Sequence, residues 1–332
     1  MFSKKVSVVS GGGGFIGHHL VKNLERNENV IVLDNFARGT PERLKDCANN
    51  VKVIRCDLTD YDDLKQSLSG YEINNFYHLA AINGTGNFYK IPLQIMDVGV
   101  MSCFNILKFS LETEISKIIV ASSAEVYQNA SIVPTPEDIP LIVPSVHNPR
   151  YSYALSKIYT EYYSYQFGKI HKKNISIFRP HNVYGPDMGL QHVVPQFIME
   201  FLKNKSEDQA KIDVKGSLDA IRSFCYVDDI VAGIKLLSEK NDGVNVYNIG
   251  TNHKVSMSDL LDEISTISKT EYQINQNDNQ HIGGTKLRCP DISKISELGF
   301  NPIYSLNQGL TNTYEWYENN YETLIKNKTE NY

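Results

Sequence analysis

Ser10-Gly-Gly-Gly-Gly-Phe-Ile-Gly17 stands between a β-rich run and a stretch with helical spacing, and it decides the fold. Its glycines Gly11, Gly14 and Gly17 lie three residues apart. Glycine at the first position permits a tight turn, at the second lets the backbone approach a diphosphate, and at the third lets helix and strand pack closely. An acidic residue, Asp34, follows about 20 positions later, at the end of the next β-rich run. This arrangement predicts a dinucleotide-binding turn, with the diphosphate at the helix N-terminus.

Short β-rich runs alternate with helical stretches through the first half of the chain. The expected strands are Lys5–Ser10, Asn29–Asp34, Val51–Cys56, Asn75–Leu79, Lys117–Ala121 and Ile175–Phe178. This alternation predicts an α/β fold with a doubly wound parallel (Rossmann) sheet and right-handed crossovers. We expect an NAD-binding domain over residues 1–178 and a smaller C-terminal α+β substrate domain over residues 179–325. A segment near residues 225–255, which includes the expected strand Val246–Ile249, should return to the main sheet.

The composition is that of an ordinary globular protein and excludes several classes of function. The chain has 332 residues, 41% hydrophobic and 21% charged, with a net charge of −5. It has no basic excess to neutralise a nucleic-acid backbone, and no apolar run approaches the ~20 residues of a membrane span. The five cysteines are scattered without a CxxC pair, which favours a reducing cytoplasm and argues against a metal site. We therefore expect a cytoplasmic protein with neither nucleic acid nor membrane as partner.

The identity of the cofactor depends on Asp34. Its carboxylate can accept both hydroxyls of an adenosine ribose and would repel a 2′-phosphate, so the sequence favours NAD over NADP. Arg38 could contact a phosphate, but we interpret it as a solvated loop charge. Asp57, after the third expected strand, is suited to a hydrogen bond with adenine, and a helix cap before Asp60–Leu64 is an equal alternative.

Tyr153 and Lys157 stand four residues apart, on one face of an expected helix. A free phenol has a pKa of about 10, and bringing it near 7 requires roughly 4 kcal/mol of differential stabilisation. Lys157 and a positive nicotinamide ring can supply this field. Tyr153 would then take a hydroxyl proton while a hydride leaves the same carbon for NAD. Ser123, at the end of a strand, could hold that oxygen or merely cap a helix.

The motifs together resemble the extended short-chain dehydrogenase/reductase family, in particular its nucleotide-sugar epimerases and dehydratases. The resemblance spans nearly the whole chain. It is carried by Gly11–Gly17, Asp34-Asn35, Asp57-Leu58, His78-Leu-Ala-Ala81, Ser122–Tyr127, Tyr153/Lys157, Arg179–Pro186, Arg222–Asp229, Asn248-Ile-Gly250 and Arg288–Asp291. It implies NAD as cofactor, a nucleotide sugar as substrate, and a homodimer formed through two helices of the first domain.

The resemblance also implies roles for individual residues. The catalytic set is Ser123, Tyr153, Lys157 and Glu125. The cofactor-binding set is Gly11, Gly14, Phe15, Ile16, Gly17, Asp34, Asn35, Asp57, Leu58, Leu79, Ala80, Ala81, Tyr153, Lys157 and Pro180. The substrate-binding set is Ser123, Asn182, Val194, Arg222 and Arg288, with the two arginines on the two phosphates. The chain departs from the family pattern at Gly99, usually Asn, and at Gln128, usually Gly.

Glu125 bears on which reaction follows the oxidation of a sugar hydroxyl at C4. Related 4,6-dehydratases carry an Asp acid where this chain has Ala124, whereas uronic-acid decarboxylases keep a Glu at the position of Glu125. The 3,5-epimerase that resembles this stretch has Cys there. Beside a ketosugar Glu125 should have a raised pKa suited to proton transfer, or it could simply form a hydrogen bond. His192 could be a second acid or base, although a loop histidine usually has no special role.

The sequence as a whole favours an NAD-dependent nucleotide-sugar epimerase that acts at C4 through a transient 4-keto sugar. Alternatives within the class are a C3/C5 epimerase, a 4,6-dehydratase, a decarboxylase and a C4 dehydrogenase. A non-catalytic NAD-sensing or scaffold protein is the alternative from another class, and the presence of both Tyr153 and Lys157 argues against it.

Overall fold

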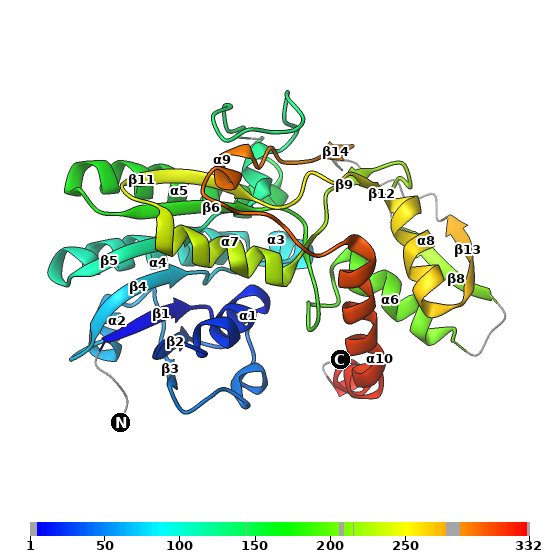
Figure 1. The fold of residues 1–332 in the computed structure, drawn as a ribbon, viewed down its shortest axis with the longest axis horizontal. Coiled ribbons are helices and arrows are strands. Elements are labelled where there is room, and N and C mark those ends of the chain that lie inside the picture. The colour runs from blue at the N-terminus through cyan, green and yellow to red at the C-terminus, as the bar shows by residue number, and fades with distance from the viewer. Residues whose placement is uncertain (1–4, 144, 206–208, 215, 277–285, 331–332) are drawn as a thin grey trace.

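The fold is built on one parallel sheet of seven strands, in the order β11-β6-β5-β4-β1-β2-β3 (Figure 1). The computed structural model describes residues 5–143, 145–205, 209–214, 216–276 and 286–330. The strands are β1 (Lys5–Ser10), β2 (Val30–Asp34), β3 (Val51–Arg55), β4 (Glu72–His78), β5 (Ile115–Ala121), β6 (Ile175–Pro180) and β11 (Val244–Ile249). The predicted doubly wound parallel sheet is therefore confirmed.

Helices cover both faces of this sheet. The helices α2 (Tyr61–Ser67), α4 (Pro92–Glu112) and α5 (Ser152–His171) pack on one face, and α1 (Phe15–Leu24), α7 (Val227–Lys240) and α9 (Ser293–Ser296) pack on the other. Successive strand residues point to opposite faces, so Val8 of β1 joins the first core and Val9 joins the second. Both residues are fully buried, which explains why β1 carries valines on both of its faces.

A second, smaller lobe lies beyond the carboxyl ends of the main strands, at the right of Figure 1. The strands β8 (Gln209–Val214) and β13 (Glu271–Gln276) pair in parallel, and α6 (Val193–Lys203), α8 (Met257–Ser268) and α10 (Leu306–Glu330) pack around a third core. Ser256 and Asp259 form a reciprocal capping box at the start of α8, as their spacing predicts.

Short elements connect the two lobes and surround the carboxyl edge of the sheet. They are η1 (Pro41–Leu44), α3 (Thr85–Lys90), η2 (Ala124–Tyr127), η3 (Pro149–Tyr151), β7 (Val183–Tyr184), β9 (Ile221–Arg222), β10 (Cys225–Tyr226), β12 (Val255–Ser256) and β14 (Leu287–Arg288). All five cysteines are free thiols. Across the described residues, no helix combines the length and apolar character needed to cross a bilayer.

Candidate active site

The glycine-rich turn joins β1 to α1 and lies against the loop that follows β4. Gly11 has a φ of +73°, and a Cβ there would lie 2.7 Å from the backbone nitrogen of Ala80. A Cβ at Gly17 would lie 2.1 Å from the carbonyl oxygen of Gly11. No side chain fits at either position, so the turn keeps a bare backbone surface at the start of α1. Such a surface fits the diphosphate of a dinucleotide.

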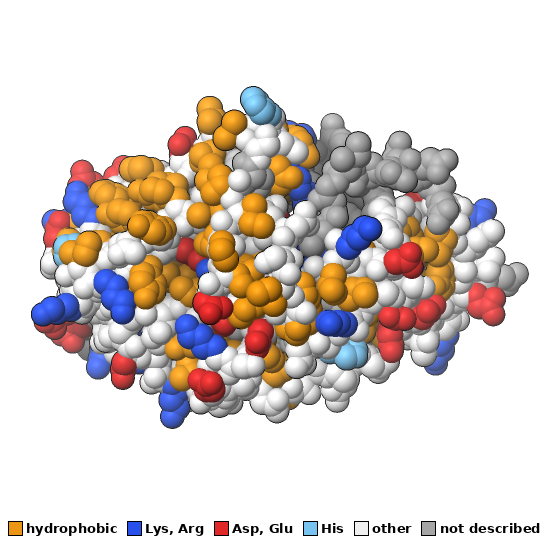
Figure 2. Space-filling model, turned by 90° about the horizontal axis from the view of Figure 1, so that it is seen from above, with side chains coloured by type: hydrophobic (Ala, Val, Ile, Leu, Met, Phe, Trp, Pro, Cys, Tyr) orange, Lys and Arg blue, Asp and Glu red, His pale blue; other side chains and the backbone are white. Residues whose placement is uncertain are grey.

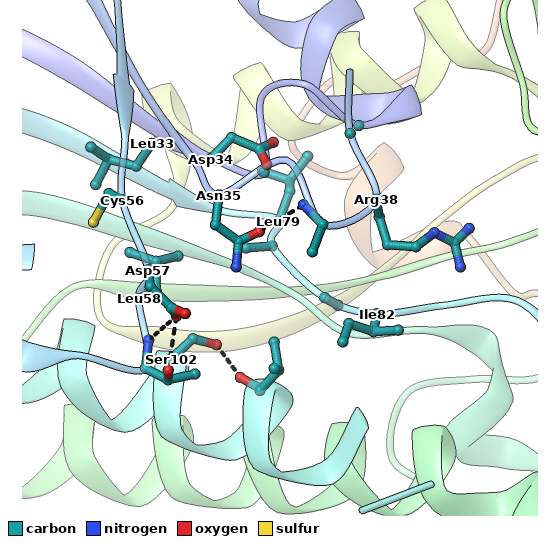
Figure 3. Close-up of a pocket in the computed structure, with 18 of the residues that line it drawn as sticks. Leu33, Asp34, Asn35, Arg38, Cys56, Asp57, Leu58, Leu79, Ile82 and Ser102 are labelled. Carbon is teal, nitrogen blue, oxygen red and sulfur yellow. Dashed lines mark hydrogen bonds between the residues drawn. The ribbon is translucent and has the colours of Figure 1, made fainter. Parts of the chain in front are cut away.

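A cavity of about 330 Å³ opens beside this turn, at the carboxyl ends of β1 to β4 and against α4 (Figure 3). The predicted cofactor residues that line it are Gly11, Gly14, Asp34, Asn35, Asp57, Leu58, Leu79, Ala80 and Ala81. The predicted residues Phe15, Ile16, Gly17, Tyr153, Lys157 and Pro180 are not in its lining. Helix α4, which no sequence motif pointed to, adds Gln94, Asp97, Val98, Met101 and Ser102.

Two of the acidic residues that line this cavity, Asp34 and Asp57, are held by different local contacts. Asp34 is buried, and its carboxylate accepts hydrogen bonds from the backbone N–H groups of Gly13 (2.9 Å) and Phe36 (2.8 Å). It therefore fixes the glycine-rich turn, a role that its sequence position did not reveal. Asp57 accepts hydrogen bonds from the backbone and hydroxyl of Thr59. The helix-cap alternative for Asp57 is wrong, because Asp60 is the residue that caps α2.

Tyr153 and Lys157 lie on α5, next to the end of β5. Lys157 is buried and its Nζ donates to the carbonyl oxygen of Ala121 at 2.7 Å. The same Nζ lies 5.8 Å from the centre of the Tyr153 ring. That ring stacks on Phe88 of α3, with ring centres 5.6 Å apart and an angle of 15°. Ser123 caps η2 and also shares a side-chain hydrogen bond with Tyr153, so the capping role and the proposed catalytic role are compatible.

The polypeptide alone does not acidify this phenol. Burial raises the pKa of Tyr153 to about 12, and the hydrogen bond with Ser123 opposes this rise only in part. Burial also lowers the pKa of Lys157 to about 8, so the amine stays mostly protonated at neutral pH. The expectation of a phenol pKa near 7 is therefore not met by these two residues, and a further positive charge beside Tyr153 is needed to reach it.

Glu125 forms an ion pair with Arg288, with 2.7 Å between Oε1 and Nη1. Burial by itself would raise the pKa of Glu125, but the charge and hydrogen bond of Arg288, aided by Arg150 and Arg222, outweigh it and lower the pKa. The predicted raised pKa is therefore wrong, because a guanidinium from the distant β14 meets the carboxylate. Glu125 is held as an anion, in a state that neither donates a proton nor readily accepts one.

Apart from Ser123, the predicted substrate residues all lie in the second half of the chain. Arg222 and Arg288 are neighbours in register on the parallel strands β9 and β14. Burial lowers the pKa of Arg222 to about 10, and repulsion from Arg288 adds to this effect. Asn182 donates from Nδ2 to the carbonyl oxygen of Ser223 at 3.1 Å, which ties it to the same region. Val194 is 2% exposed and packs in the third core, so its side chain supports α6 from within.

The two departures from the family pattern fit the local backbone. Gly99 lies where α4 crosses α5, and a Cβ there would lie 3.0 Å from the side chain of Ser156. Gln128 ends η2 with a φ of +48°, and its Nε2 donates to the carbonyl oxygen of Glu125 at 2.6 Å. Both residues therefore help to place the segments that carry Tyr153 and Glu125.

A buried ion pair, which the sequence analysis did not identify, links the elements that carry the catalytic residues. Arg179 of β6 meets Glu161 of α5 through two hydrogen bonds, 2.8 and 2.6 Å long, and both residues are buried. Arg179 also donates to the Tyr127 hydroxyl at 2.6 Å, and the Ser122 hydroxyl donates to Glu161. The pair thus fixes α5 against the segment that contains Ser123.

Two further predictions about single residues concern Arg38 and His192. Arg38, interpreted from the sequence as a solvated loop charge, is exposed in a loop and also lines the cofactor cavity. His192 precedes α6, and its pKa is lowered by burial and then by the charge of Arg38. Within the described residues, no three His, Cys, Asp or Glu side chains come together in a cluster that could hold a metal ion.

Known proteins resemble this chain along nearly its whole length. UDP-glucuronic acid decarboxylase 3 of Arabidopsis thaliana is 32% identical over 311 residues, which cover 91% of this chain and 86% of the relative. UDP-N-acetyl-alpha-D-glucosaminuronate decarboxylase of Bacillus cytotoxicus is 28% identical, with 95% and 98% covered. The crystal structure of UDP-glucose 4-epimerase with UDP-glucose from Thermotoga maritima matches with a TM-score of 0.82 at 27% identity, with 96% and 99% covered.

The family assignment rests on sequence as well as on fold. Residues 7–250 match the NAD dependent epimerase/dehydratase family, and this match includes the glycine-rich turn, Ser123, Tyr153 and Lys157. The bare backbone at Gly11 and Gly17 and the adjoining cavity fit the dinucleotide that this family uses. The chain therefore belongs to the NAD dependent epimerase/dehydratase family, and its cofactor is NAD.

Proposed function

We propose that this chain is a nucleotide-sugar 4-epimerase that acts through a transient 4-keto sugar. The observation that carries the proposal is a contrast between Tyr153 and Glu125, the two groups of the site that could transfer a proton. Tyr153 has Ser123 and Lys157 beside it for proton transfer at one hydroxyl, whereas the nearby carboxylate of Glu125 is neutralised by Arg288. The site thus has one complete acid–base group at Tyr153, whereas Glu125 is in the wrong protonation state to serve as a second one.

The proposed roles of the residues follow from their contacts. Ser123 holds the C4 oxygen of the sugar and Tyr153 takes the proton from it. When bound, NAD supplies the acceptor and donor of the C4 hydride and a positive charge close to the phenol. That charge counteracts the effect of burial, which otherwise holds the pKa of Tyr153 at about 12. After the 4-keto sugar has turned over, Tyr153 returns the proton to the same oxygen, now on a carbon of inverted configuration.

Two of the competing reactions, dehydration and C3/C5 epimerisation, need a group that this site lacks in the required form. Loss of water from the sugar needs an acid at the departing hydroxyl, and Ala124 has none to offer. Proton abstraction at C5, which a C3/C5 epimerase requires, needs a base, and the ion pair with Arg288 lowers the basicity of Glu125. Epimerisation at C4 needs only Tyr153. The 4-epimerase of Thermotoga maritima, crystallised with UDP-glucose, supports a nucleotide sugar as the substrate class.

Incubation with a panel of UDP-, GDP-, CDP- and dTDP-sugars in D2O tests this proposal. We expect one nucleotide sugar to be converted into its C4 epimer of unchanged mass, because the C4 hydrogen travels as a hydride and never exchanges with solvent. Mass spectrometry and NMR of the product measure both properties. Carbon-bound deuterium in the product would contradict the proposal, since it requires proton transfer next to the ketone and implicates Glu125. Loss of carbon dioxide or water would contradict it as well.

We also propose that the chain forms a homodimer through α4 and α5. Both helices expose large apolar side chains to solvent, namely Met101, Phe104, Leu111, Tyr159, Tyr162 and Ile170. Figure 2 shows apolar side chains gathered at the left of the molecule, the end where Figure 1 places these helices. A contiguous apolar face of this kind is typical of a protein–protein interface. A second copy can cover it with the same face in two-fold symmetry.

Replacement of Tyr162 by Lys tests the dimer. Tyr162 is 70% exposed, so a lysine is tolerated in the monomer but would be buried without a partner in the dimer. We expect light scattering to give twice the chain mass for the unmodified protein and the single mass for this variant. Ile303→Lys is the matched control, because Ile303 is 74% exposed and lies outside both helices. A monomeric unmodified chain, or a Tyr162→Lys variant that remains dimeric, would disprove the assigned interface.

A further inference from the structure

We propose that Arg38 binds the diphosphate of the dinucleotide and that it is a determinant of cofactor affinity, rather than a contact to the 2′-phosphate of NADP. Arg38 lies in the loop between β2 and η1. Neither the family match nor the roles implied by the resemblance assign it a function.

The side chains that line the cavity carry more negative than positive charge. Arg38 is the only lysine or arginine among the described residues that line it, whereas Asp34, Asp57 and Asp97 contribute three carboxyl groups. A diphosphate that entered this cavity would meet the bare backbone of the glycine-rich turn and these acids. A guanidinium is the side chain best suited to offset such repulsion, because it can form two parallel hydrogen bonds with phosphate oxygens.

Arg38 also has no carboxylate partner among the described residues. Arg43 pairs with Asp187, Arg179 with Glu161 and Arg288 with Glu125. In the part of the chain that the structure describes, Arg38 forms no such pair. Although much of its side chain is exposed, burial of the guanidinium and repulsion from Arg43 lower the pKa of Arg38. A partly desolvated cation without a counter-ion is unfavourable, and a bound anion would remove this cost.

The guanidinium of Arg38 lies against the loop that follows β4. A Cβ on Gly84 would lie 2.8 Å from Nη1 of Arg38, so the guanidinium lies directly against the loop that contains Gly84. Gly84 belongs to the loop between β4 and α3, the helix that carries Phe88 against Tyr153. Figure 3 shows Arg38 at the same end of the cavity as Ile82, with Asp57 and Leu58 at the other end.

The position of Arg38 in the cavity favours the diphosphate of the dinucleotide over the 2′-phosphate of NADP as its ligand. Asp57 marks the end of the cavity where we expect adenine, and Tyr153 marks the side where the sugar reacts. The group of NAD that connects these two ends is the diphosphate. A 2′-phosphate would instead sit on the adenosine ribose beside Asp34, whose carboxylate faces the backbone of Gly13 and Phe36.

The backbone next to Arg38 is already fixed in place. The N–H of Thr40 donates to the carbonyl oxygen of Gly13 at 3.1 Å, and Nη1 of Arg43 donates to the same oxygen at 3.2 Å. A Cβ at Gly39 would lie 2.7 Å from the backbone of Gly13, so this loop rests directly on the glycine-rich turn. Arg38 is therefore attached to a preorganised loop, which reduces the entropy lost on binding.

Calorimetric titration of the full-length chain, freed of nucleotide by dialysis, tests the proposal. The probes are ADP, which carries the 5′-diphosphate, adenosine, which has no phosphate, and 2′-AMP, which carries only the 2′-phosphate. We expect Arg38→Met to weaken ADP binding about 10- to 100-fold, as for the loss of a charge-assisted hydrogen bond. Binding of adenosine and of 2′-AMP should not change. Arg38→Lys should recover part of the ADP affinity, because it restores the charge without the bidentate geometry.

The control is Arg26→Met, which removes an exposed arginine beyond the end of α1 and should leave ADP binding unaltered. Equal ADP affinity of Arg38→Met and the unmodified chain would overturn the proposal. A loss that appears for 2′-AMP but not for ADP would do the same and would assign Arg38 to the 2′-phosphate. An equal loss for adenosine and ADP would also overturn it, because Arg38 would then support only the shape of the cavity.

Discussion

Replacing Tyr153 with Phe is expected to lower kcat by about 10²- to 10⁴-fold, the range typical of the loss of a general acid–base. The substitution removes one oxygen and leaves the ring, which keeps its stacking against Phe88 at 5.6 Å. Binding of ADP and of the nucleoside diphosphate of the substrate should therefore change little. Steady-state turnover and calorimetric titration measure the two effects separately.

Tyr165→Phe is the matched control for this prediction, because Tyr165 lies on the same helix and packs against the first core. We expect its turnover to equal that of the unmodified chain. Comparable turnover by Tyr153→Phe and Tyr165→Phe would show that another group moves the proton. Equal losses of turnover and of nucleotide binding in Tyr153→Phe would instead indicate a structural role for the phenol.

Replacing Glu161 with Gln is expected to lower the free energy of unfolding by about 3–5 kcal/mol, because it leaves the charge of Arg179 buried without its partner. Arg179 and Glu161 are 3% and 4% exposed, so water cannot take the place of the lost carboxylate. Urea denaturation followed by circular dichroism measures the change. Since the pair joins α5 to β6 and contacts Ser122, turnover should fall together with stability.

Two further variants test whether the loss of stability comes from the buried ion pair itself. Glu112→Gln removes a carboxylate from the exposed pair with Lys65 and should leave the denaturation midpoint almost unchanged. The double variant Glu161→Gln/Arg179→Met removes both partners and should recover part of the stability lost in the single variant. A Glu161→Gln variant as stable as Glu112→Gln would contradict the importance we give to the buried pair.

The sequence was sufficient to predict the architecture because local patterns determine it. Strand β1 has the bounds Lys5–Ser10 that its apolar run predicts, and the glycine-rich turn follows from positions where any Cβ would collide with backbone. Strand β4 begins at Glu72, earlier than its predicted start at Asn75. Glu72 is exposed and polar, so the apolar pattern on which the prediction relied begins only after it.

The electrostatics of the site could not be predicted in the same way, because they depend on residues far apart in the chain. Glu125 and its partner Arg288 are 163 positions apart, and only the fold shows that their charges meet. The same holds for the position of Arg38 beside Gly84. Glu161 and Arg179 are only 18 positions apart, but their pairing also depends on how α5 packs beside β6. Spacing within one helix predicts that Tyr153 and Lys157 share a face, but it cannot predict how deeply both are buried.

Stopped-flow absorbance of the NAD-loaded chain tests most directly the central claim that Tyr153 takes a sugar proton while a hydride passes to bound NAD. After mixing with the nucleotide sugar that the panel identifies, we predict a transient absorption band of reduced nicotinamide. The band should form more slowly when C4 of the sugar carries deuterium, and it should be almost absent in Tyr153→Phe. Product formation without any reduced nicotinamide, or an equal band in Tyr153→Phe, would contradict the claim.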